Sequence, residues 1–391
     1  METMAEYLAE LVKAGLEDRK AASLPEGVSV REIVKISEEN HMDYLLLGAL
    51  LKTDGLSEEE KELLREKVLG SMLFTGMQLQ ELKKLEERME QAKIPCQPMK
   101  GARMKFYYPS PFLREMSDID ILIHGDFMEQ AAVELEAMGY VLQQKIKHHD
   151  IYRKAPGIVV EAHRAMYDRT VDERQYAYFS DLSRAVRRKG FLYVYDFEAE
   201  DFYIYMMAHM AKHFYKRGCG IRNLVDIYVF LEKFGGEMNA DYLQKQFAGL
   251  GLTAFTEHME KARIWLQGEP GEAFYQQLFD YMQGCGIYGK DENGIWNRFC
   301  DAQPEKGEKG RDALKRWYWF PPYEYMVLYY PWLSRNPVAG KFLLPAAWGI
   351  RAVRGVVCGR GKYKREMLRQ IDASQIGVRQ DIYRRLQLRF H

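Results

Sequence analysis

The feature that most restricts the fold is a pair of acids at the start of an apolar stretch: Asp118 and Asp120 lead into the run 121–123, which reads Ile-Leu-Ile. An alternation of acidic and apolar residues that becomes fully apolar is typical of a strand entering a sheet. Successive side chains of a strand point to opposite faces, so Asp118 and Asp120 share one face. Ile119 and Ile121 are expected on the other face, toward the core. Two neighbouring carboxylates repel each other unless a cation binds both, and oxygen ligands of this kind suit Mg²⁺ or Mn²⁺.

The residues around this strand predict a small mixed sheet. Two prolines in the segment 94–101 exclude an ordinary helix interior and favour a short strand that ends in a glycine turn. Apolar periodicity and turn residues then predict helices over 102–108 and 127–138, and strands over 118–123, 140–144, 146–152 and 158–163. Strand, helix, strand, helix and three strands in this order indicate an α+β fold.

Other polar side chains are expected near the two aspartates. Glu161 lies in an otherwise β-branched strand and shares a face with His163. If this strand pairs with the strand of Asp118, three carboxylates converge, as a two-metal centre requires. Lys100 and Gly101 end one strand and open a helix, where free N–H groups would face an anion such as a triphosphate, and Arg114 would add a second cation.

Helical regions flank the predicted sheet. Ser29 and Ser57 are each followed three residues later by glutamate, which is the spacing of a helix-starting capping box. We predict a helical N-terminal region over 1–93 that serves in packing or dimerisation. The predicted core of the α+β fold spans 94–198, a helical domain spans 199–283, and a helical, aromatic region with a basic tail spans 284–391.

These residues resemble the uncharacterised bacterial nucleotidyltransferase family of the polymerase-beta-type superfamily. The resemblance is carried by a glycine turn after a strand, an Asp-x-Asp motif on the next strand and a lone acid on a later one. In this sequence it covers about 95–354 and rests on Met99–Gly101, Tyr108–Pro109, Arg114, Met116, Asp118–Ile123, Gly139–Tyr140, Val160–His163, Lys212–His213, Arg222, Asp226, Leu344–Pro345 and Arg351. Gly101-Ala102 stands where the superfamily has Gly-Gly or Gly-Ser.

The resemblance implies transfer of a nucleotide from a nucleoside triphosphate, with ATP as the expected donor, to an unknown small-molecule, protein or RNA acceptor. Asp118 and Asp120 would hold two Mg²⁺ or Mn²⁺ ions. Glu161 would bind the catalytic ion and help to deprotonate the acceptor. His213, Arg222 and Asp226 would line the cleft from the helical domain, with His163 nearby. Two alternatives stay open: a catalytically silent binding or regulatory module of the same fold, and a metal-dependent nucleotide hydrolase.

Two histidine groups invite other interpretations. His209 and His213 have the four-residue spacing of paired zinc ligands, but no third ligand is obvious, so we expect core or hydrogen-bonded histidines. The sequence His148-His149-Asp150 is similar to metal phosphohydrolase motifs, which lie on helices, whereas this segment alternates like a strand. We therefore favour a solvated hairpin there, with contact between His149 and a base or acceptor as the alternative.

Composition bounds the remaining possibilities. Lys plus Arg equals Asp plus Glu at 56 each, so no overall field favours nucleic acid, although the stretch 1–90 is acidic and the stretch 351–391 is basic. The aromatic run 317–332 is expected to be core, with nucleic-acid or membrane-surface binding as less favoured options. The five cysteines lack a Cys-x-x-Cys pair, and neither a signal peptide nor an apolar run long enough to span a bilayer is present, which together predict a cytoplasmic location.

Overall fold

The computed structural model describes most of the chain and divides it into two compact units. The described residues are 4–123, 125–146, 148–167, 172–180, 182–263, 272–290, 293, 307–357, 366 and 373–388. The first unit comprises Met1–Phe214, Cys219–Gly289 and Leu388–His391, and the second comprises Tyr215–Gly218 and Lys290–Gln387. The four domain boundaries predicted from the sequence stay a prediction.

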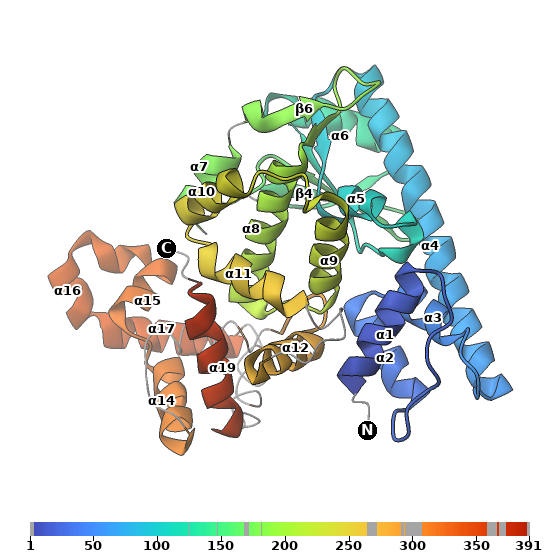
Figure 1. Cartoon of the computed structure of the whole chain (residues 1–391). Helices are drawn as coiled ribbons and strands as arrows, with labels where there is room; N and C mark the ends of the chain where they lie inside the picture. The colour runs from blue at the N-terminus through green and yellow to red at the C-terminus, as the bar shows by residue number, and fades with distance from the viewer. Residues whose placement is uncertain are drawn as a thin grey trace. The chain divides into compact units, whose positions relative to one another are not determined.

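The first unit begins with helices, as predicted. They are α1 (Met4–Leu16), α2 (Val30–Asn40), the π-helix η1 (Asp43–Leu47), α3 (Gly48–Leu50) and the long α4 (Glu58–Gln91), which runs along one side of the unit (Figure 1). Both predicted capping boxes are confirmed: the Ser29 and Ser57 hydroxyls accept hydrogen bonds from the backbone N–H groups of Glu32 and Glu60, and each glutamate side chain accepts one in return. These local contacts fix where α2 and α4 start.

A five-stranded mixed sheet forms the centre of this unit and confirms the predicted α+β class. The strands are β1 (Cys96–Pro98), β2 (Ile119–Ile123), β3 (Val141–Lys145), β4 (His149–Lys154) and β5 (Ile158–His163), in the order β1-β2-β5-β4-β3. The pair β2–β5 is parallel and the other pairs are antiparallel. Asp118 lies just before β2, one residue outside the strand that contains Asp120. The predicted strand over 146–152 was placed too early, because β4 begins only at His149.

Short helices connect the first strands. The predicted helix 102–108 is in fact the short α5 (Lys100–Met104) followed by the 3₁₀ turns η2 (Lys105–Tyr107) and η3 (Pro111–Leu113). The prediction for 127–138 is confirmed by the 3₁₀ turn η4 (Gly125–Phe127) and α6 (Met128–Ala137). Proline at 109 and 111 prevents α5 from extending, since neither residue can donate to a helical hydrogen bond.

The hydrophobic core lies between one face of the sheet and the helices α4 and α6. Alternate residues of β2, namely Ile119, Ile121 and Ile123, point into it, as the alternating pattern predicts. They pack with α4 through Leu82, Leu85 and Met89 and with α6 through Ala131 and Leu135. The N-terminal helical region is therefore continuous with the core of the sheet. Asp120 lies on the opposite face of β2, away from this core.

Further helices complete the first unit. They are α7 (Glu173–Phe179), the 3₁₀ turn η5 (Leu182–Arg184), α8 (Ala199–Arg217), α9 (Arg222–Phe234), α10 (Ala240–Leu250), α11 (Thr253–Ala262) and α12 (Ala273–Cys285). A two-stranded antiparallel ribbon of β6 (Ala185–Arg187) and β7 (Tyr195–Phe197) precedes α8. Nothing in the sequence pattern predicted this ribbon, because each strand has three residues and no clear alternation.

The second unit is helical in its described residues. It contains α14 (Gly307–Trp319), α15 (Tyr323–Tyr329), the 3₁₀ turn η7 (Pro331–Arg335), α16 (Pro337–Phe342), α17 (Leu344–Val357) and α19 (Ala373–Leu386). Met326, Leu333 and Ala347 form a small core. The predicted aromatic core is confirmed in part, since Trp317 and Tyr318 are buried whereas Trp319 and Phe320 are exposed. Much of the basic tail lies outside the described residues.

No helix in the described part of the chain combines the length and the apolar character that a bilayer span requires.

Candidate active site

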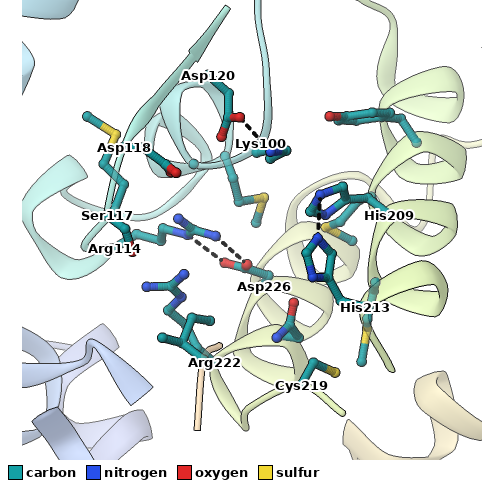
Figure 2. A pocket seen from close by; sticks show the side chains of 18 of the residues that line it. Lys100, Arg114, Ser117, Asp118, Asp120, His209, His213, Cys219, Arg222 and Asp226 are labelled. Atoms are coloured by element: carbon teal, nitrogen blue, oxygen red, sulfur yellow. Dashed lines mark hydrogen bonds and ion pairs between the residues drawn. The ribbon is translucent and has the colours of Figure 1, made fainter. Parts of the chain in front are cut away.

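The three predicted carboxylates meet at one pocket. Because β2 and β5 are parallel neighbours in register, Asp120 lies directly beside Glu161. Asp118, Asp120 and Glu161 all line a cavity of about 320 Å³, which Figure 2 shows from close by. The convergence expected from the sequence is confirmed, and it depends on the pairing of two strands that lie about forty residues apart.

Lys100 also lies in this pocket, but its partner is a carboxylate. Its ammonium group is 2.5 Å from Asp120 Oδ1. The backbone φ of Lys100 is +46°, which is uncommon for a residue with a Cβ atom and is stored strain of order 1 kcal/mol or more. The side chain of this residue, at the start of α5, reaches β2. Burial by itself would lower the pKa of Lys100, but the adjacent Asp120 carboxylate raises it above its usual value, so the lysine is a fixed positive charge.

The pKa values of the two aspartates are shifted in opposite directions. Burial and the neighbouring Asp120 carboxylate raise the pKa of Asp118 to about 7. Burial also acts to raise the pKa of Asp120, but the charge of Lys100 and a hydrogen bond with His163 overcome it and lower that pKa. Three carboxylates therefore face one ammonium group, and the excess negative charge falls on Asp118 and Glu161. A divalent cation would remove this repulsion, so the donor set fits a metal ion.

Two histidines contact the carboxylates of Asp120 and Glu161. His163 Nε2 lies 2.7 Å from Asp120 Oδ1 and 3.3 Å from Glu161 Oε2. His149, directly opposite His163 in the β4–β5 ladder, places its Nε2 3.7 Å from Glu161 Oε1. Both imidazoles are buried. The predicted solvated hairpin is therefore wrong for His149, because the register of β4 turns its ring toward β5. The sequence pattern alone held no signal for this contact.

His209 and His213 form the wall opposite the sheet. Both belong to α8 and line the pocket, and their Nε2 atoms lie 3.1 Å apart (Figure 2). The prediction of hydrogen-bonded histidines is confirmed, and each histidine is the partner of the other. Burial and the adjacent His213 ring lower the pKa of His209 well below its usual value, so His209 is neutral and one ring of the pair donates to the other.

At the other end of the pocket, Arg114 and Asp226 form a buried ion pair. The Arg114 guanidinium donates hydrogen bonds of 3.2 and 2.9 Å to the two Asp226 oxygens, and the Tyr108 hydroxyl donates a third, of 2.7 Å, to the same carboxylate. This pair joins the segment before β2 to α9. The sequence predicted Arg114 as a phosphate ligand and Asp226 as a cleft residue. The structure places both in the pocket lining and bonds them to each other.

Beside this pair lie two cations without a carboxylate partner among the described residues. Arg222 begins α9, lines the pocket and donates to the backbone oxygen of Glu115, but its Nε atom has no partner in the described structure. Lys105, which sequence reasoning missed, is fully buried and its ammonium likewise lacks a hydrogen-bond partner in that part of the chain. Burial and the nearby Arg114 charge lower the pKa of Lys105 to about 7. This end of the pocket is therefore electropositive.

Gly101 has a steric role here. A Cβ atom at this position would lie 2.5 Å from Arg114 Nη1 and 2.9 Å from the Met116 Cβ. Glycine is therefore needed so that α5 can approach Arg114. The predicted contact of Gly101 with phosphate stays a prediction, although the residue does line the pocket.

The N-terminal helices also support the pocket, which the predicted packing role did not specify. The Asn40 side chain accepts a hydrogen bond from the Ile221 N–H just before α9. The Glu115 carboxylate accepts one from the Tyr44 N–H, and Ser117 is hydrogen-bonded to His41. These contacts link α2 and η1 to the two segments that carry Arg114 and Arg222.

A family model described as an uncharacterised nucleotidyltransferase matches residues 26–261, well over half of the chain. The chain belongs to this family. The match to the uncharacterised nucleotidyltransferase family begins upstream of Pro95, where the sequence resemblance starts, and takes in helices α2 to α4. It ends before Leu344 and Arg351, and it contains every residue that lines the pocket except Ile287 and Tyr288.

Two further comparisons add little. The crystal structure of an antigenic nucleotidyltransferase-like protein from Paracoccidioides brasiliensis is 17% identical to this member of the uncharacterised nucleotidyltransferase family, with a TM-score of 0.29 over 51% of this chain and 94% of that chain. A similarity of that size supports no argument. No curated protein matches the chain.

Proposed function

We propose that this pocket transfers a nucleotide from a nucleoside triphosphate to a hydroxyl or amine acceptor. The observation that carries the proposal is the register of β2 and β5, which sets Asp120 beside Glu161 in a pocket that also holds Asp118. Membership of the uncharacterised nucleotidyltransferase family supports the same reaction class. Kinship with the polymerase-beta-type superfamily is part of the proposal, as are ATP as donor and a cytoplasmic location.

Asp118, Asp120 and Glu161 are the proposed ligands of Mg²⁺ or Mn²⁺. When bound, such an ion would neutralise phosphate oxygens and polarise the phosphorus that is attacked. Lys100 holds Asp120 in the absence of a metal ion and would move to the phosphates once a cation binds that carboxylate. Glu161 is only partly buried, and it would accept the acceptor's proton.

The electropositive end of the pocket would hold the remaining negative charge of the substrates. Arg222 faces the cavity without a carboxylate partner in the described chain, whereas Arg114 is already bonded to Asp226. We therefore assign phosphate contact to Arg222 as well as to Lys100, and to Arg114 the positioning of the loop before β2. His213 and Asp226 complete this wall.

The alternative of a catalytically silent module has one observation in its favour. In the structure, the Lys100 ammonium already neutralises Asp120, so the fold does not need a metal ion to tolerate that carboxylate. A relic of the family would keep this ion pair as a structural element.

Calorimetric titration of ATP, GTP, CTP and UTP in the presence of Mg²⁺ or Mn²⁺ tests the proposal. The full-length protein is compared with Asp120→Asn and with Asp126→Asn, a matched control at an exposed position outside the pocket. We expect metal-dependent binding of one nucleotide to the wild type and the control, and its loss in Asp120→Asn.

The products distinguish the reaction classes. Release of pyrophosphate upon addition of candidate acceptors supports nucleotidyl transfer, and release of orthophosphate supports a hydrolase. Absence of binding for all four nucleotides with either metal ion refutes the proposed function and leaves the silent module.

A further inference from the structure

His149, Glu161 and His163 form a set of metal-ligand atoms of which only Glu161 was predicted from the sequence to bind a metal ion. One ligand atom each from His149, Glu161 and His163 lies within 4.8 Å of the other two. They come from two strands: β4 supplies His149, and β5 supplies Glu161 and His163. The rigid ladder between these strands, with His149 directly opposite His163, holds the three side chains together.

The contacts within this set are close to those of a coordination sphere. Metal bonds of about 2.1 Å to nitrogen and oxygen place neighbouring ligand atoms roughly 3.0–3.4 Å apart. Glu161 Oε2 is 3.3 Å from His163 Nε2, and Glu161 Oε1 is 3.7 Å from His149 Nε2. Small side-chain rotations would therefore close the three groups around one ion.

Nothing in the described chain engages the other nitrogen of either ring. The Nδ1 atoms of His149 and His163 are buried and have no hydrogen-bond partner among the described residues. Each Nε2 can therefore either donate to a carboxylate or present its lone pair to a metal ion, because no Nδ1 contact fixes the tautomer.

We propose that His149, Glu161 and His163 form a metal site of two nitrogens and one carboxylate that prefers a borderline divalent ion such as Mn²⁺ or Zn²⁺ over Mg²⁺. The inference rests on the proposed function, since the site shares Glu161 with the pocket and names the class of metal that Glu161 would bind. Imidazole suits Zn²⁺ and other transition metals, and Mg²⁺ selects oxygen ligands and water. Two histidines and one carboxylate are a donor set that transition metals take with open positions for further ligands.

Asp120 connects this site to the rest of the pocket. Its Oδ1 atom is shared between His163 and Lys100 in the structure. An ion on His163 Nε2 ends the hydrogen bond between His163 and Asp120, so the carboxylate turns either to the ion or wholly to Lys100. The predicted carboxylate ligands and the histidine site are thus coupled through one oxygen atom.

The test is metal binding by the full-length protein after removal of metal ions with a chelator. Titration with MnCl₂ is followed by the electron paramagnetic resonance signal of free Mn²⁺, and Mg²⁺ and Zn²⁺ are added as competitors. Electron spin echo modulation of bound Mn²⁺ detects nitrogen ligands directly. We expect nitrogen coupling and Mn²⁺ affinity at least about tenfold above Mg²⁺ affinity.

Variants assign the ligands. We expect His149→Ala and His163→Ala each to weaken Mn²⁺ binding by about tenfold or more and to reduce the nitrogen modulation, with Mg²⁺ affinity changed by less than about threefold. His258→Gln is the matched control, since it removes an imidazole from α11 that is hydrogen-bonded to Tyr275. Circular dichroism reports whether each variant is folded. The nitrogen modulation of Mn²⁺ bound to the wild-type protein tests the site even if a variant does not fold.

The outcomes separate the two claims. Three results would each overturn the histidine site. They are a wild-type protein without nitrogen modulation, equal affinity of the wild type for Mn²⁺ and Mg²⁺, and Mn²⁺ binding that is unchanged in both histidine variants. Titrating ATP into the Mn²⁺-loaded protein tests the proposed function separately. Nitrogen-coupled Mn²⁺ without any nucleotide binding would leave the metal site in place and refute the transferase, and nucleotide binding with oxygen-bound Mg²⁺ alone would do the reverse.

Discussion

The ion pair between Arg114 and Asp226 gives the sharpest prediction about what holds the pocket together. Both side chains are almost fully buried, and Asp226 accepts from Arg114 at two oxygens and from the Tyr108 hydroxyl. Asp226→Asn removes the charge that compensates Arg114, while Arg222 and Lys105 remain buried nearby. Removal of one partner from a buried pair costs about 3–5 kcal/mol, because the other charge is left without compensation.

Native-state hydrogen exchange measures this loss locally. The amides of α9, which carries Asp226, should exchange about a hundredfold faster or more in Asp226→Asn, since each 1.4 kcal/mol is about tenfold in an opening equilibrium. Glu62→Gln is the control: Glu62 pairs with Arg65 at 3.4 Å on an exposed face of α4, where the loss should stay below about 1 kcal/mol. Exchange in α9 within about threefold of the wild type would refute the reasoning that this pair fastens α9 to the strand segment.

Three further predictions concern the neighbouring side chains. Gly101→Ala should keep the fold but displace Arg114, whose Nη1 lies 2.5 Å from the position of the new Cβ, and should reduce nucleotide binding in calorimetry by about tenfold; an unchanged affinity contradicts the steric role. Arg222→Gln should weaken binding of inorganic triphosphate without lowering the melting temperature. Burial and the nearby Arg114 charge lower the pKa of Arg222 to about 10, so the fold disfavours this charge and does not depend on it. A large drop in melting temperature would instead indicate a structural cation. Lys105→Met should abolish a rise in stability with pH. The pKa of Lys105 is about 7 in the folded protein and higher in the unfolded chain, so the unfolded chain binds more protons between about pH 7 and 10. In urea unfolding, the wild type should therefore gain about 2 kcal/mol of stability relative to the variant from pH 7 to pH 9. Parallel pH profiles of the two proteins would show that Lys105 is solvated.

Several features of this protein could be predicted from the sequence because they depend on residues close in the chain. The alternation at Asp118–Ile123 predicted β2, its core face and its polar face. Ser29 and Ser57 predicted two helix starts through contacts that span three residues. The spacing of His209 and His213 predicted that they share one face of a helix, where the structure brings their rings into contact. In each case the local geometry of one element was sufficient.

The cluster behind the carboxylates could not be predicted in the same way. His149 was predicted to lie in a solvated hairpin, because the residues around it do not indicate which strand pairs with theirs. Its contact with Glu161 arises from the β4–β5 register, and a shift of one residue would turn the ring to the other face. Lys105 gave no signal either, since a lysine without a partner is normally exposed.

The sequence by itself thus determined the class of the fold and the positions of the carboxylates at β2 and on β5, because periodicity is a property of neighbouring residues. Its resemblance to a nucleotidyltransferase family indicated the membership that the family match shows. The tertiary structure alone decided what each group touches. The parallel pairing of β2 with β5 set Asp120 beside Glu161, the packing of α5 beside β2 brought the Lys100 ammonium to Asp120, and the approach of α9 left Arg222 facing the cavity. Such contacts join segments far apart in the chain, and long-range packing fixes them.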